Sequence, residues 1–398
     1  MGLKLGLVRF ADRRIGIPLC WAVSHGLRPP VRPHPPGDPR RILLMKWVGF
    51  GNLVLASPAI SAIRRRYPLA DITFVTLSAN RGLLERFPDL DRVYYFDVSG
   101  LKSVARETAR LIAFLHRERF DLVIDFEQFS RYSAIMTGLS GAPVRVGFDT
   151  PEQNRAGVYT HPVRYRDGAH MADVFGDLAR TLEGEVDARQ LIAPVLVEDD
   201  ITRAEVFIAE EALKAGEFVI LHPGTGLNAP QRRWPPERYA ELADRIAADT
   251  GLSVVLSGSP SEKALLERIN GLARTYCSLT AGRLNLAGFA ALMQKSAVLV
   301  CSDSGPVHLA AALNVPTVAL YGPNSPELYG PVGSCNTILW KRLPCSPCIT
   351  NLNDKLTHCP HGECIQQITV EEIYLAIRRH LARRPETRPA GASTQRLV

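Results

Sequence analysis

Apolar residues in this chain form short continuous runs, and these alternate with longer stretches in which apolar positions recur every three or four residues. Buried strands are predicted at 41–47, 71–77, 92–96 and 121–126, with helices at 53–67 and 104–119. A second series has strands in FVILHP, LSVVLSG, AVLVC and PTVALY, and helices at 236–250, 261–272 and 307–313. Strands that alternate with helices predict parallel sheets covered by helices on both faces, which is an α/β fold.

The chain contains two such series within 398 residues, which is too long for one ordinary hydrophobic core. We therefore expect two similar α/β domains, at 38–200 and 201–368. An amphipathic helix at 369–384 follows, and the Arg- and Pro-rich tail at 385–398 is predicted to be disordered.

Residues 1–37 differ from the rest, because an arginine-flanked apolar stretch (IGIPLCWAVSHGL) precedes a proline-rich linker. The apolar stretch is shorter than the roughly 20 residues needed to span a bilayer. We expect it to lie in the headgroup layer of an anionic membrane with Trp21 at the interface; the alternative is a helix docked on the protein's own surface.

The net charge of +7 suits an anionic membrane surface. The chain has no array of basic and aromatic residues suited to nucleic acid, and we recognise no secretory cleavage signal. The expected location is cytoplasmic, peripheral on the inner face of the membrane.

The most informative motif is SDSGPVH, which lies between a predicted buried strand and a predicted helix. This places Asp303, Ser304 and Gly305 at the carboxyl end of a parallel strand and at a helix N-terminus, where open α/β sheets bind ligands. The positive end of a helix dipole favours an anion such as a diphosphate. His308 alone would be assigned a structural role, but here it lies close enough to share the site.

Two further loops follow strands of the second series. HPGTGLNAPQRRW brings Thr225, Gly226 and Arg232, which suit close contact with phosphate. SGSPSEK brings Glu262, which either accepts hydrogen bonds from ribose hydroxyls or merely balances the helix dipole. Together the three loops indicate a nucleotide diphosphate. The chain lacks GxxxxGK[ST] and GxGxxG, which argues against a nucleotide triphosphatase or a dehydrogenase.

The order of these motifs over residues 40–380 resembles glycosyltransferase family 9, which includes the ADP-heptose:lipopolysaccharide heptosyltransferases. SDSGPVHLAAAL is the most specific piece of the resemblance. The resemblance implies a GT-B fold of two Rossmann-like domains facing a cleft, with a C-terminal helix that crosses back to the first domain. It implies a donor on the second domain and an acceptor on the first. It assigns phosphates to Thr225, Gly226 and Arg232, the nucleoside to Glu262, and the diphosphate and sugar to Asp303, Ser304, Gly305 and His308.

One position departs from the family pattern. Family members end the first loop in Gly-Asp, and that Asp is taken as the base, whereas this chain has Gly51-Asn52. An amide cannot act as a general base, although Asn52 can orient the acceptor. Asp125 and Glu127 in DFEQ are the candidate substitutes; Asp125 is equally interpreted as a loop anchor. A non-catalytic sugar-nucleotide-binding protein is the other interpretation of Asn52.

Four of the eight cysteines form two close pairs with the spacing C-x2-C-x10-C-x4-C. Such pairs suit a structural zinc or iron ion bound by Cys345, Cys348, Cys359 and Cys364. His358 and His361 are substitute ligands, and reduced thiols or an incidental disulfide are the alternatives.

The expected reaction is inverting transfer of a heptose or related sugar from a nucleotide diphosphate to a lipopolysaccharide or other glycan or glycolipid acceptor. A base accepts the acceptor proton while Arg232, His308 and the helix N-termini stabilise the departing diphosphate. No organic cofactor is expected. A catalytic divalent metal is not required if these groups neutralise the leaving group.

Overall fold

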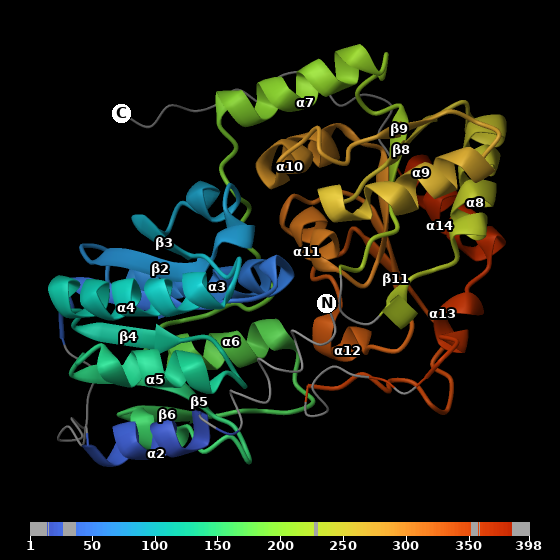
Figure 1. Ribbon diagram of the computed structural model, residues 1–398. Helices are drawn as coiled ribbons and strands as arrows, with labels where there is room; N and C mark the ends of the chain where they lie inside the picture. Colours follow the sequence, from blue (N-terminus) through green and yellow to red (C-terminus); the bar gives the residue numbers. More distant parts are fainter. Residues whose placement is uncertain are drawn as a thin grey trace.

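The computed structural model describes Arg14 and residues 16–26, 37–226, 230–351, 357 and 359–383. These residues form two lobes, each built on a six-stranded parallel sheet (Figure 1). The first sheet consists, in spatial order, of β3 (Arg92–Phe96), β2 (Asp71–Leu77), β1 (Arg41–Met45), β4 (Leu122–Asp125), β5 (Val144–Asp149) and β6 (His161–Arg164). The second consists of β9 (Cys277–Leu279), β8 (Ser253–Leu256), β7 (Phe218–His222), β10 (Val298–Ser302), β11 (Thr317–Tyr321) and β12 (Asn336–Trp340).

Both sheets have the doubly wound strand order 3-2-1-4-5-6. The order reverses between β1 and β4 in the first lobe and between β7 and β10 in the second. Ligands of such sheets bind outside the carboxyl ends of the strands at this reversal. The prediction of two Rossmann-like halves is therefore confirmed. The loops after β1, β4, β7 and β10 lie at the reversals, and the loop that carries Glu262 follows β8, the neighbour of β7.

Helices cover both faces of the first sheet. They are α3 (Phe50–Arg66) and α6 (Met171–Arg180) on one face, and α2 (Gly16–Gly26), α4 (Leu101–Glu118) and α5 (Arg131–Leu139) on the other. Strand β1 contributes to both cores, because successive side chains of a strand point to opposite faces. Ile42 and Leu44 pack with α3 and α6, whereas Leu43 and Met45 pack with α4 and α5.

The second sheet is covered in the same way. One face carries α8 (Pro236–Thr250), α9 (Lys263–Leu272) and α14 (Val370–Ala382); the other carries α7 (Glu198–Glu210), α10 (Leu286–Lys295) and α11 (Gly305–Ala312). Short helical turns lie at η1 (Ser78–Asn80), η2 (Leu84–Arg86), η3 (Ala156–Val158), η4 (Pro230–Arg232), η5 (Pro260–Glu262), α12 (Pro326–Tyr329) and α13 (Glu363–Gln366).

The last helix differs from the expectation of a crossing back to the first lobe. Helix α14 packs against α8 and against strands β10, β11 and β12, which all belong to the second lobe. Its apolar face, including Ile373 and Ile377, is buried in that lobe's core. The tail at 385–398, which was predicted to be disordered, and the last residue of the predicted helix, 384, lie outside the described residues.

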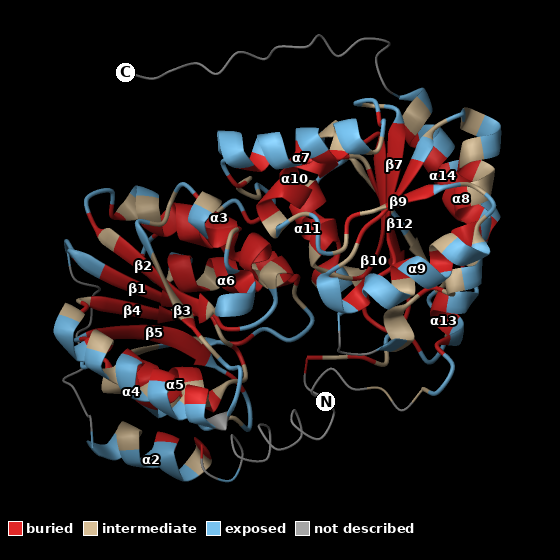
Figure 2. Ribbon diagram, turned by 45° about the horizontal axis from the view of Figure 1, so that its top comes forward, coloured by how far each residue is buried: buried red, intermediate tan, exposed pale blue. Residues whose placement is uncertain are grey.

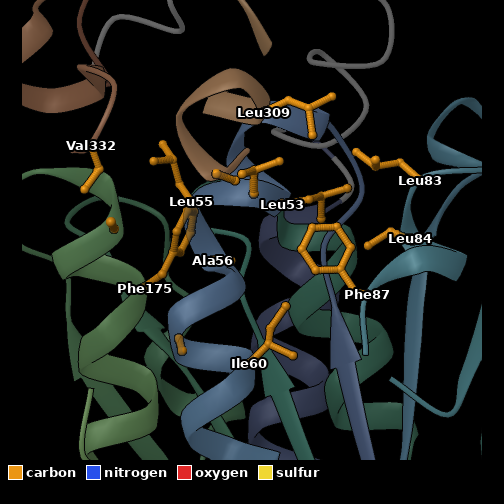
Figure 3. Close-up of a cluster of buried hydrophobic side chains, with 14 of the residues drawn as sticks. Leu53, Leu55, Ala56, Ile60, Leu83, Leu84, Phe87, Phe175, Leu309 and Val332 are labelled. Atoms are coloured by element: carbon orange, nitrogen blue, oxygen red, sulfur yellow. The ribbon is translucent and has the colours of Figure 1, made fainter. Parts of the chain in front are cut away.

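The two lobes share an apolar contact. Helix α3 of the first lobe packs against α11 of the second, and Figure 3 places Leu309 beside Leu53 and Leu55, with Val332 near Phe175. Figure 2 shows buried residues continuing from one lobe into the other along this contact. An ion pair of 2.5 Å between Arg86 and Asp200 adds a polar link near the point where the chain crosses between lobes.

Helix α2 docks on the first lobe, as the alternative interpretation of the N-terminal segment proposed. It packs against α5 and η3, and Cys20 is fully buried there. Its outer face leaves Leu19 45% and Trp21 63% exposed. In the described part of the chain, no helix is long and apolar enough to cross a bilayer. The flanking arginines Arg9 and Arg13 and the proline-rich linker lie outside the described residues.

Candidate functional site

Three loops of the second lobe meet at one edge of its sheet, as their positions after strands β7, β8 and β10 require. The guanidinium of Arg232, carried by η4, connects two of them. It donates a hydrogen bond of 2.9 Å to the carbonyl oxygen of Asp303 and one of 3.0 Å to the carbonyl oxygen of Thr225. It also lies 3.4 Å from the Asp303 carboxylate. Residues 227–229 of the first loop lie outside the described residues.

Glu262 connects the loop after β8 to the loop after β7. One carboxylate oxygen accepts a 3.2 Å hydrogen bond from the backbone N–H of Gly226, and the other accepts from the N–H and hydroxyl of Ser259 in a capping box. Burial raises the pKa of Glu262, but the hydrogen bonds from Ser259 and Gly226 and the nearby His222 hold it below its ordinary value. The structure thus brings Glu262 to the loops and engages it within them; its contact with a nucleoside stays a prediction.

The polar turn before α11 presents a helix N-terminus to the same group. Ser304 is the N-cap in extended conformation, and Pro306 occupies the first turn. The Ser304 hydroxyl donates to the carbonyl of Ser302, and His308 is buried in the first turn. Asp303, Ser304, Gly305 and His308 therefore lie beside Arg232 and at the positive end of a helix dipole, an arrangement that suits an anion.

The first lobe meets this turn directly through the beginning of α3. A Cβ atom built on Gly305 would lie 2.2 Å from the ring of Phe50, and one on Gly51 would lie 2.9 Å from the Cα of Gly305 and from the His308 ring. Real Cβ atoms do not approach so closely, so a side chain at position 51 would collide with backbone, and one at position 305 would require the Phe50 ring to move. Asn52 follows in the first turn of α3, so the residue that departs from the family pattern lies next to the contact between lobes.

Glu127 lies at the strand-order reversal of the first lobe. Its carboxylate accepts a 2.7 Å hydrogen bond from the N–H of Trp47, and it lies 3.4 Å from the ammonium of Lys46. Lys46 is buried, whereas the Glu127 side chain keeps 13% of its surface exposed. Glu127 is therefore an ionisable group held at the carboxyl end of the first sheet and still in contact with solvent.

Asp125, the other candidate base, lies beneath that surface. Its side chain and that of Arg155 are both completely buried, and they form an ion pair of 2.6 Å. The hydroxyls of Ser133 and Tyr159 donate to the same carboxylate oxygen, and the N–H of Glu127 donates to the other. A carboxylate enclosed by four donors anchors the loop that carries Glu127, which matches the structural alternative and is an unfavourable position for proton transfer to a bound acceptor.

Of the four clustered cysteines, Cys345, Cys348 and Cys359 precede α13, and Cys364 lies within that helix. Burial, together with Cys348, Cys345 and Cys359 nearby, raises the pKa of Cys364 to about 11, and a hydrogen bond from Gly362 lowers that of Cys359. No disulfide joins any of the eight cysteines. Among the described residues, no three His, Cys, Asp or Glu side chains form a group that would hold a metal; His358 lies outside these residues, so the predicted metal site is not confirmed.

Sequence reasoning missed three residues that shape the site. Lys46 had a signal, because a lysine interrupts an apolar strand, ILLMKW. Arg155 lies in a turn-rich stretch and Asn324 follows a strand end, and neither has a local pattern that announces a buried partner. Their roles depend on contacts across 30 and 21 residues, with Asp125 and Asp303 respectively.

Comparisons with known proteins agree with this geometry. The model of glycosyltransferase family 9 (heptosyltransferase) matches residues 108–357. The chain is 28% identical to lipopolysaccharide heptosyltransferase 1 of Pseudomonas aeruginosa, covering 78% of this chain and 86% of that protein. It is 28% identical to lipopolysaccharide heptosyltransferase 2 of Escherichia coli, covering 72% and 83%. The structure of E. coli ADP-heptose lipopolysaccharide heptosyltransferase II superposes with a TM-score of 0.69 at 24% identity, covering 86% and 98%.

Two doubly wound lobes that meet near their switch-point loops form a GT-B fold. Because the family model spans well over half of the chain, this protein belongs to glycosyltransferase family 9. The expectation of an enzyme is confirmed, and nothing in the comparisons favours the non-catalytic sugar-nucleotide binder suggested by Asn52.

Proposed function

We propose that this glycosyltransferase moves a heptose from ADP-heptose to a lipopolysaccharide acceptor. The observation that carries the proposal is the convergence of Thr225, Arg232 and Asp303 at the N-terminus of α11, opposite the first-lobe loop that ends in Asn52. The family and the names of the relatives support the sugar and the acceptor, and the name of the E. coli structure supports ADP.

The donor diphosphate binds between Arg232 and the α11 N-terminus, with Thr225 and Gly226 against phosphate oxygens and Glu262 towards the nucleoside. Ser304, Gly305 and His308 contact the diphosphate and the sugar. Because the Phe50 ring lies on Gly305, donor binding at this turn requires the ring to move or the lobes to separate locally.

The reaction is a single displacement. The acceptor hydroxyl oxygen forms a bond to the anomeric carbon as the bond from that carbon to the diphosphate oxygen breaks, which inverts the anomeric centre. Glu127 accepts the hydroxyl proton, since it is solvent-accessible at the switch point and Asp125 is enclosed. Asn52 orients the acceptor, and Arg232 and the helix dipole stabilise ADP as it leaves.

A transfer assay tests the proposal. Purified protein is incubated with ADP-heptose and lipopolysaccharide that lacks core heptose, and product is followed by mass spectrometry, with UDP-, GDP- and CDP-sugars as comparisons. Transfer of heptose from ADP-heptose is expected. Binding without transfer or hydrolysis, across all donors and acceptors, would contradict the enzyme mechanism.

A structural metal ion at the four clustered cysteines is also part of the proposal. Cys345, Cys348, Cys359 and Cys364 supply a four-thiolate set suited to structural zinc or iron, and the N–H of Gly362 donates to the Cys359 sulfur in the manner of a thiolate ligand. Stoichiometric zinc or iron is expected in protein prepared with and without oxygen. Less than a tenth of an equivalent in both preparations would contradict the site.

Peripheral attachment to the inner face of the cytoplasmic membrane is also proposed. The support is the outer face of α2, where Leu19 and Trp21 are exposed close to Arg14. The L19S/W21S double variant is expected to bind anionic vesicles severalfold less than wild type in co-sedimentation, whereas Val195→Ser, at another exposed apolar position, retains binding. Equal binding by both variants would contradict the assignment.

A further inference from the structure

The segment that carries the four cysteines holds the loop after β11 in place. We call residues 345–351 and 359–364, the described stretches that carry the four cysteines, the cysteine segment. The Ser346 hydroxyl donates a 2.6 Å hydrogen bond to the carbonyl of Gly322. The N–H groups of Cys348 and Ile349 both donate to the carbonyl of Pro323, at 2.9 and 2.8 Å. Three hydrogen bonds therefore fix two successive carbonyls of this loop.

The loop held in this way reaches the donor site through its next residue. The side-chain N–H of Asn324 donates a 2.8 Å hydrogen bond to the Asp303 carboxylate, and its oxygen accepts from the N–H of Ser325. Because the amide oxygen accepts from Ser325, the NH₂ group of Asn324 is the end that faces Asp303. Asn324 is buried, and Arg232 lies 3.4 Å from the same carboxylate oxygen. Asn324 and Arg232 together set the orientation of Asp303.

The other end of the cysteine segment touches the loop that carries Arg232. A Cβ atom on Gly362 would lie 2.9 Å from the carbonyl oxygen of Gln231, the residue before Arg232. The cysteine segment therefore contacts the loop that carries Asn324 and the loop that carries Arg232, the two side chains that lie beside the Asp303 carboxylate.

The same segment also bonds to the first lobe. Asn351 is buried; its side-chain oxygen accepts a 2.6 Å hydrogen bond from the Tyr329 hydroxyl, and its N–H donates at 2.7 Å to the hydroxyl of Tyr165. Tyr165 belongs to the first lobe, immediately after β6. A second contact between the lobes, from His170 to the carbonyl of Gly330, lies next to Tyr329.

We propose that the cysteine segment is a positioning element that couples the donor site to the closure of the lobes, with Asn324 and Asn351 as its positioning residues. Asn324 orients Asp303 for the donor, and Asn351 holds the first lobe at the distance at which acceptor and donor meet. The inference rests on the proposed function only in placing the donor diphosphate at Arg232 and Asp303.

The Asn324→Ala variant tests the donor end. Loss of a hydrogen bond to a carboxylate is expected to raise the donor KM and the Kd for ADP about tenfold. The kcat and the acceptor KM stay within twofold of wild type. If Asn324 had only a structural role, the substitution would lower the amount of folded enzyme but would not raise the donor KM relative to the acceptor KM.

The Asn351→Leu and Tyr165→Phe variants test the end at the first lobe. Each is expected to lower kcat about tenfold while the Kd for ADP stays unchanged. The double variant is expected to lose no more than Asn351→Leu alone, since that substitution already removes the bond to Tyr165 together with the bond from Tyr329. Asn351→Asp restores kcat, because a carboxylate accepts hydrogen bonds from both tyrosine hydroxyls. The control is Asn336→Ala, whose amide donates only to Val332 and Gly333 in its own lobe.

The outcomes separate this inference from the proposed function. If wild-type protein fails to bind ADP in a calorimetric titration, the proposed function fails. If it binds ADP and the Asn324, Asn351 and Tyr165 variants all behave like Asn336→Ala, the positioning inference is overturned while the proposed function stands. If Asn351→Leu or Asn324→Ala does not fold, Tyr165→Phe and Asn351→Asp decide, because each retains the buried volume and most polar contacts.

Discussion

The two lobes share one strand order but use the carboxylate at the end of their fourth strand differently. In the first lobe Asp125 is completely buried and accepts hydrogen bonds from Arg155, Ser133 and Tyr159. In the second lobe Asp303 lies at a helix N-terminus between a half-buried Arg232 and Asn324. The same topological position thus serves stability in one lobe and the proposed ligand site in the other. The difference lies in how completely neighbouring donors enclose the carboxylate.

Arg155→Met should produce the largest difference between the lobes. It leaves the Asp125 carboxylate buried without its counter-charge, and such a loss costs about 3–5 kcal/mol of unfolding free energy. Arg232→Met, in the second lobe, is expected to cost less, because that ion pair is longer, at 3.4 Å, and the Asp303 carboxylate keeps the hydrogen bond from Asn324. Urea unfolding followed by circular dichroism measures both values. Equal losses in the two variants would remove the distinction between the two carboxylates.

Glu127→Gln is expected to produce the next largest effect, a loss of catalytic rate. The amide oxygen still accepts the N–H of Trp47, but it cannot accept the acceptor proton. The buried Lys46 ammonium loses its counter-charge, so kcat is compared at a temperature at which urea unfolding shows the variant to be folded. A fall in kcat of about 10²–10⁴ is expected at saturating substrates. Glu183→Gln, at an exposed surface ion pair, is the matched control. A kcat within twofold of wild type would assign the base to another group.

Arg232→Lys sharpens the proposed donor role of the second lobe. A lysine keeps the charge but cannot bond the Thr225 and Asp303 carbonyls at once, as the guanidinium does. The donor KM is expected to rise about tenfold, with the acceptor KM unchanged. Initial rates over both substrate concentrations measure this. An equal rise in both KM values would point to a general loss of structure.

The sequence predicted the architecture well where apolar periodicity was strong, and poorly elsewhere. Strands β1, β2, β3 and β10 and helices α4, α8 and α9 lie close to their predicted positions, whereas β5, β6, β9, β12, α5, α7 and α10 were not predicted. Most of the missed strands are short or half-exposed; β6, HPVR, alternates half-buried and exposed positions and contains a proline. Strand β5, VRVGFD, is buried, but an arginine and a glycine interrupt its apolar run. A local pattern is too weak there, and only pairing with neighbouring strands defines the element.

The residues of the candidate site also fall into those that local sequence patterns predict and those that only the fold identifies. The second-lobe loops were found because glycines, arginines and a strand-end Asp-Ser-Gly have local signatures, and the strand order then brings them together. Asp125 and Glu127 are two residues apart and look equivalent in sequence. Burial distinguishes them, and burial depends on Arg155, which no local motif connects to Asp125.

The smallest predicted effect concerns acid stability. Burial lowers the pKa of His222 to about 4, from 6.5. The neutral ring is therefore favoured in the folded state, and stability is lost as pH falls below 6.5, where only the unfolded state takes up the proton. At pH 5.5 this costs about 1.4 kcal/mol.

His222→Asn should reduce the difference in unfolding free energy between pH 7.5 and pH 5.5 by that amount. Urea unfolding at both pH values measures it. An unchanged difference would show that His222 is accessible to protons in the folded lobe.

A crystal structure of the wild-type enzyme with ADP is the most direct test of the donor site. We expect the diphosphate at the N-terminus of α11, within hydrogen-bond distance of Arg232 and the Gly305 N–H, with the Phe50 ring displaced from Gly305. A diphosphate bound elsewhere, with Phe50 still against Gly305, would contradict the assignment of the second-lobe loops.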